Sequence, residues 1–99
     1  MMNKKTLYLL RLSPFTNQHN VELCCDTLTM NDSVVLMDDG CYTLNHQLLN
    51  KLILSCENVY IIKTHAIARG LSLSNNTQAI DITKLNQYIF EYSNSVTWQ

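Results

Sequence analysis

Two kinds of hydrophobic spacing alternate along the chain and predict strands separated by helices. Short apolar runs with β-branched residues are typical of strands that are buried on both faces. They occur at 6–12, 33–37, 59–63 and 79–82. Elsewhere apolar residues recur every three or four positions, which is typical of amphipathic helices. Such helices are expected over about 17–28, 43–55, 64–70 and 83–92.

Cap residues place the expected ends of the later helices. Thr64 is expected to cap the third helix, and Gly70 stands where a helix often leaves through a left-handed residue. Thr83 is expected to cap the last helix. The tail at 95–99 carries Trp98 and could add an edge strand.

The alternation of strands and helices predicts a fold class. Each return between parallel strands needs a crossover, and a helix is the usual one. We therefore expect a small α/β layered domain over residues 1–99, with a mainly parallel sheet of four to five strands and helices on both faces.

Composition and charge exclude several functions. The 99 residues carry eight acids and seven scattered bases, whereas binding of a nucleic-acid backbone needs clustered cations. No run approaches the roughly 20 apolar residues that cross a bilayer. Four cysteines occur in long periodic segments with only two glycines, which does not resemble a disulfide-rich secreted domain. Free thiols in a reduced, cytoplasmic setting are expected.

The cysteines separate into two groups. Cys24, Cys25 and Cys56 lie on core-facing stripes, where a thiol acts as a small hydrophobe. Cys41 instead follows a strand and precedes a helix, a position that suits a nucleophile or a persulfide carrier. Nearby Asp38 and Asp39 would raise its pKa, and no basic residue is adjacent. We expect Cys41 to line the rim of the sheet or an interface rather than to react.

The remaining candidates are weaker. The three histidines (His19, His46 and His65) have no metal-ligand spacing, and two glycines cannot form a phosphate loop, so no metal or cofactor is expected. Four aromatic residues lie outside the stripes and are candidates for an interface or for the edge of the core. They are Phe15, Tyr42, Phe90 and Trp98.

Four segments in order resemble the DsrH/TusB family: 7–15 (LYLLRLSPF), 33–42 (SVVLMDDGCY), 59–71 (VYIIKTHAIARGL) and 96–98 (VTW). The resemblance implies a DsrE/DsrF/DsrH-like fold and a cytoplasmic heterohexamer, a dimer of heterotrimers, with TusC-like and TusD-like subunits. Such a complex passes persulfide sulfur through a TusE-like acceptor toward 2-thiolation of the transfer-RNA wobble uridine. The sulfur-carrying cysteine belongs to the TusD companion, so no catalytic residue transfers to this chain. Cys41 stands where relatives often have an aliphatic residue, and Thr64 and His65 stand where they have acids.

The sequence therefore favours a non-catalytic subunit of a sulfur-relay complex that does not bind transfer RNA itself. Three alternatives stay open. The chain could be a small sulfurtransferase with persulfide on Cys41, a DsrH-type subunit of sulfur oxidation, or a homo-oligomeric binding module.

Overall fold

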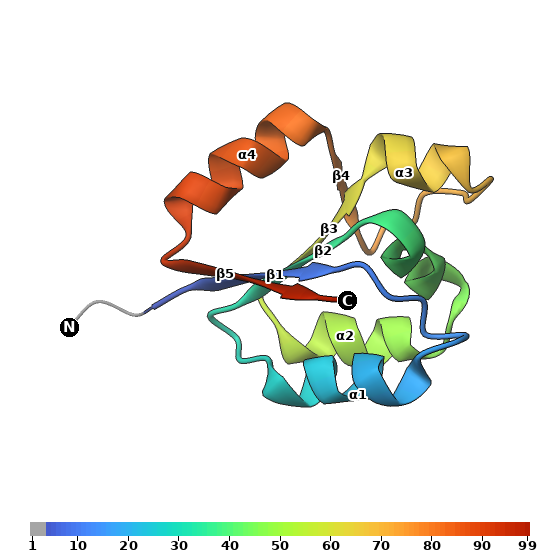
Figure 1. Ribbon diagram of the computed structural model, residues 1–99, viewed down its shortest axis with the longest axis horizontal. Coiled ribbons are helices and arrows are strands. Elements are labelled where there is room, and N and C mark those ends of the chain that lie inside the picture. The colour runs from blue at the N-terminus through green and yellow to red at the C-terminus, as the bar shows by residue number, and fades with distance from the viewer. Residues whose placement is uncertain (1–3) are drawn as a thin grey trace.

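The computed structural model describes residues 4–99 and confirms the predicted α/β architecture (Figure 1). The strands are β1 (Thr6–Leu10), β2 (Ser33–Leu36), β3 (Asn58–Ile62), β4 (Gln78–Ile80) and β5 (Asn94–Trp98). The α-helices are α1 (Gln18–Thr27), α2 (Leu48–Ser55), α3 (Lys63–Ala68) and α4 (Ile82–Glu91). A 3-10 helix, η1 (Asp38–Asn45), lies between β2 and α2.

All five strands are parallel, in the order β4-β3-β2-β1-β5. The first four strands step in one direction, and α4 then carries the chain back across the sheet to the far side of β1. The expected edge strand in the tail is confirmed as β5, whose end is fixed by a 3.0 Å hydrogen bond from the Arg11 amide to the Trp98 carbonyl. The carboxyl ends of β1, β2 and β3 consequently lie side by side.

The two faces of the sheet carry separate apolar clusters. On one face, alternate strand residues such as Tyr8, Val34 and Val59 pack with apolar residues of α1 and α2. On the other, Leu7, Val35 and Tyr60 pack with α4, whose Leu85 is buried. Figure 1 shows α1 and α2 together beneath the sheet and α4 above it. This confirms helices on both faces. No helix of residues 4–99 has the length and apolar character that a membrane crossing requires.

A buried carboxylate ties the loop before β2 to the start of β1. Asp32 accepts hydrogen bonds from the Thr6 amide at 3.2 Å and from the Thr29 amide and hydroxyl at 2.9 and 3.1 Å. The contact of this loop with β1 spans 26 residues and leaves no local pattern in the sequence. Since Asp32 is buried, its carboxylate depends on these protein donors in place of water.

The segment after β2 differs from the expectation. Asp38-Asp39-Gly40 forms the first turn of η1, and α2 begins at Leu48 rather than near residue 43. Asp38, not the glycine, takes the left-handed backbone, with φ of 49°. Gly40 is needed for a different reason: a β-carbon there would lie 1.9 Å from the carbonyl oxygen of Leu10. η1 therefore packs directly against the end of β1.

Two of the predicted helix caps are wrong, whereas the predicted left-handed residue after α3 is confirmed. The cap of α3 is Ile62 rather than Thr64, with no side-chain cap hydrogen bond, because α3 continues directly from β3. α4 is capped two residues before Thr83, by Asp81, whose carboxylate accepts from the Lys84 amide at 2.8 Å. Gly70 does adopt the left-handed backbone, with φ of 69°.

Candidate functional site

The polar side chains that follow the central strands meet at the carboxyl edge of the sheet. Arg11 follows β1, Asp38 follows β2, and His65 and Arg69 lie on α3 and at its end, directly after β3. Open parallel sheets commonly place their ligand crevices at this edge. We call these four residues with Asp39 and Gln99 the carboxyl-edge network.

Asp38 is at the centre of the carboxyl-edge network. Its carboxylate accepts from Nε of Arg11 at 2.7 Å, and the same guanidinium donates to the Gln99 amide oxygen at 2.9 Å. The Asp38 backbone amide donates to Nδ1 of His65 at 2.9 Å. Because Nδ1 accepts, the neutral ring carries its proton on Nε2.

Arg69 makes the remaining hydrogen bonds of the carboxyl-edge network. Its guanidinium donates from Nε to the Asp39 carboxylate and from Nη1 to the His65 carbonyl, both at 3.1 Å. Both arginines at this edge are therefore bound to acids of η1. These ion pairs hold η1 against β1 and α3, which is a structural role. Because both guanidinium groups are paired with carboxylates, neither arginine is free to bind an anion.

Cys41 lies in the core instead of at the rim where the sequence placed it. Its side chain is 0% exposed, and Sγ donates a weak hydrogen bond to the Leu36 carbonyl at 3.6 Å. Burial raises the pKa of the Cys41 thiol to about 11; Arg69 opposes the rise, and Asp38 and Asp39 add to it. Arg69 is the basic neighbour that the sequence did not reveal, but it does not outweigh burial.

The other three thiols are buried as their periodicity predicts. Burial raises the pKa of Cys24 to about 12 and of Cys56 to about 11, and it also raises the pKa of Cys25. All four cysteines are free and buried. A reactive thiol needs access to solvent and a lowered pKa, and none of the four has either.

Native Cys41 is expected to react with iodoacetamide at least about 100-fold more slowly than an unperturbed thiol at neutral pH, because two units of pKa remove that fraction of thiolate. Its rate should climb about tenfold per pH unit up to pH near 11. Mass-spectrometric alkylation kinetics on the folded and the urea-unfolded chain measure both effects. Cys41 alkylating equally fast in the two states would contradict its burial.

The interface candidates differ in exposure. Phe90 is 91% exposed and Phe15 is 59% exposed, whereas Tyr42 and Trp98 are half-buried. Phe15 stacks edge-on against His46 at 4.7 Å between ring centroids, and Trp98 packs on the cluster beneath the sheet. Phe15 and Phe90 thus have the exposure that a partner contact requires; their interface role stays a prediction.

Two of the histidines serve local structure. His46 accepts from the Leu48 amide at 3.0 Å at the start of α2, as His65 accepts from Asp38. Within residues 4–99, no three His, Cys, Asp or Glu side chains gather in a geometry that could hold a metal ion.

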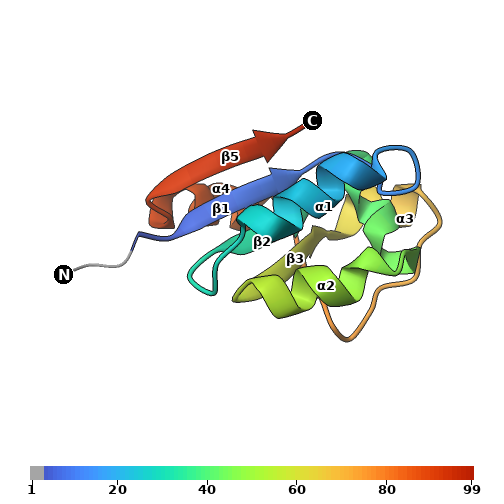
Figure 2. The ribbon, with the colours of Figure 1, turned by 90° about the horizontal axis from the view of Figure 1, so that it is seen from below.

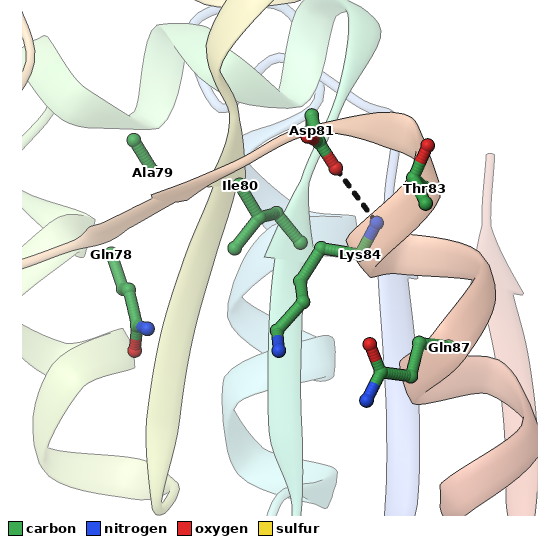
Figure 3. Close-up of a pocket in the computed structure, with 7 residues that line it drawn as sticks. All are labelled: Gln78, Ala79, Ile80, Asp81, Thr83, Lys84 and Gln87. Atoms are coloured by element: carbon green, nitrogen blue, oxygen red, sulfur yellow. Dashed lines mark hydrogen bonds between the residues drawn. The ribbon is translucent and has the colours of Figure 1, made fainter.

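Two shallow hollows flank the edge strand β4. One, of about 360 Å³, lies between β4 and the start of α4, where Lys84 and Gln87 extend from the helix on the side facing Ile80 (Figure 3). The other, of about 390 Å³, lies between the end of α2 and the loop at 75–77. Neither is lined by a cysteine or a histidine, so neither offers a sulfur nucleophile.

The fold and the buried thiols of residues 4–99 define a small parallel α/β domain whose four cysteines are all inaccessible. A family model described as "DsrH like protein" matches residues 12–95, and the chain belongs to the DsrH-like family. This membership relates it to the proteins of sulfur relay.

Two solved structures share the fold. The ychN protein from E. coli has a TM-score of 0.68 at 17% identity, covering 98% of this chain and 100% of that one. Protein Tm0979 from Thermotoga maritima has a TM-score of 0.62 at 19% identity, covering 87% of this chain and 92% of that one. No curated protein sequence matches this chain.

Proposed function

We propose that this chain is a non-catalytic subunit of a cytoplasmic sulfur-relay complex of the TusBCD type. With TusC-like and TusD-like subunits it would form a dimer of heterotrimers that passes persulfide sulfur through a TusE-like acceptor toward 2-thiolation of the transfer-RNA wobble uridine. Family membership supports the sulfur relay, and four free thiols support a reducing compartment.

One observation carries the non-catalytic role: every thiol of the chain is buried. A persulfide carrier must be attacked at sulfur by an acceptor thiolate, so its sulfur has to reach the surface. Cys41, the best positioned of the four, has no exposed surface. The buried position favours a subunit role over the alternative in which Cys41 carries persulfide.

The distribution of charge supports a role without direct contact to transfer RNA. Four of the seven basic side chains are paired with carboxylates at 2.7 to 3.7 Å. They are Lys5, Arg11, Lys51 and Arg69. Since their charges are already neutralised by acids, little cationic surface is available to phosphates.

Co-purification tests the subunit role. The tagged chain is co-expressed with untagged TusC-like and TusD-like proteins from the same genome, and both are expected to be retained in a stable complex. Retention of neither companion would overturn the proposal. Neighbouring genes for the two companions, without dissimilatory sulfite reductase, would favour transfer-RNA thiolation over sulfur oxidation.

Matched surface variants locate the companion contact. Phe15→Ser or Phe90→Ser is expected to weaken retention of a companion, because exposed aromatic side chains often anchor interfaces. Leu54→Ser is the control, since Leu54 is 79% exposed on α2 but is not an interface candidate. Equal retention by all three variants would refute the assigned contact while leaving the subunit role standing.

A further inference from the structure

The strand β5 forms an open edge of the sheet. It pairs on one side with β1 and is the last strand in the sheet order. Figure 2 shows β5 along the outer side of the molecule, with no described helix or strand beyond it. Four of its five residues are exposed.

The backbone groups on the outer side of β5 can be identified from the pairing. The Trp98 carbonyl accepts from the Arg11 amide, so Trp98 turns its backbone groups toward β1. Alternate residues of a parallel strand turn their backbone groups to opposite sides. Ser95 and Thr97 therefore direct their N–H and C=O groups away from β1, toward the open edge.

This edge lacks the protection that exposed strand edges normally have. Proteins usually shield them with charged residues, proline, bulges or very short strands, because open edges pair with other strands. Residues 92–99 include no charged side chain, proline or glycine. The opposite edge is different: β4 has three residues and runs directly into the charged cap Asp81.

We propose that β5 is a self-association edge, at which two copies of this chain pair their β5 strands antiparallel about a two-fold axis at Val96. In this register Ser95 of each copy lies opposite Thr97 of the other, and the two residues exchange their outward hydrogen bonds. Val96 meets Val96 of the second copy as the central side-chain pair. The two sheets join into one continuous sheet.

The sequence of β5 is complementary to itself in this register. Asn94 faces Trp98 of the second copy, and no position opposes a like charge. Val96, which is 41% exposed in the single chain, would be covered by its symmetry mate. The contact uses β5 alone and leaves Phe15 and Phe90 free, so it does not depend on the proposed sulfur-relay role.

A proline substitution tests the hydrogen bonds of the edge. Thr97→Pro removes an outward N–H without removing one that bonds to β1, and edge strands accept proline at such positions. By sedimentation, the native chain is expected to be a dimer, and Thr97→Pro should weaken dimerisation by at least about tenfold with nearly unchanged thermal stability. Thr97→Val, which keeps the N–H, should remain dimeric. A monomeric native chain, or a proline variant that dimerises as tightly, would overturn the proposal.

An engineered thiol tests the register. Directly opposed non-hydrogen-bonded residues have Cα atoms about 4.5 Å apart, within the range for a disulfide. Val96→Cys is therefore expected to cross-link between copies under mild oxidation, about tenfold faster than Ser95→Cys, which lies on the other face and opposite Thr97. The four native thiols are buried and should not compete. Equal cross-linking rates for the two variants would rule out this pairing.

Discussion

Replacing Gly40 by alanine is expected to destabilise the protein by about 3 kcal/mol or to prevent folding. The new β-carbon would lie 1.9 Å from the carbonyl oxygen of Leu10 and 2.8 Å from its carbonyl carbon. Both are backbone atoms at the end of β1, so no change of rotamer relieves the overlap. Urea titration of the variant and the native chain measures the change in the free energy of unfolding.

Gly70→Ala is the matched control. Gly70 has a positive φ of 69°, but apart from the glycine and its chain neighbours no atom of residues 4–99 lies within 4 Å of the place that a β-carbon would occupy there. Its substitution should cost only about 1 kcal/mol, the usual penalty for a left-handed backbone. If Gly70→Ala proved the more costly change, the close packing of η1 on β1 would be refuted.

Asp32→Ala is expected to cost about 3 kcal/mol, because it removes the buried carboxylate that accepts from the amides of Thr6 and Thr29. Asp32→Asn keeps an acceptor for one of these amides and should cost less. Thermal and urea unfolding of both variants measure the difference.

Asp26→Ala controls for the loss of a carboxylate. Asp26 is exposed and pairs with Lys51 at 2.8 Å, a surface ion pair expected to contribute no more than about 1 kcal/mol. Similar losses from Asp32→Ala and Asp26→Ala would show that the Asp32 contacts do not stabilise the loop.

The elements of the fold were predictable because burial leaves a local pattern. The run at 33–37 is almost uniformly apolar, as befits β2, whose four residues are all buried. The spacing of Val21, Cys24 and Cys25 identified the buried side of α1. The start of α2 and the role of Gly40 were not predictable, since both depend on the contact of η1 with β1, which is distant in the sequence.

The location of the candidate site was predictable from the sequence, but the burial of Cys41 and the pairing of the charged residues were not. The carboxyl edge was the expected location of Cys41, whereas the charged residues after β1 and β2 are a signal of the network that the prediction did not use. The burial of Cys41 could not be predicted from the adjacent residues, because η1 directs the thiol into the core beneath the sheet. The contact of Asp39 with Arg69 spans 30 residues and leaves no local pattern.

We infer that this chain holds no sulfur-carrying thiol, and measuring which subunit gains sulfur tests this most directly. The purified complex with its TusC-like and TusD-like companions is incubated with a persulfide donor, and each subunit is weighed intact by mass spectrometry. The TusD-like companion is expected to gain a sulfur atom while this chain keeps its mass, and a complex containing Cys41→Ala should behave in the same way. A sulfur atom gained by the folded native chain and lost in Cys41→Ala would contradict the account.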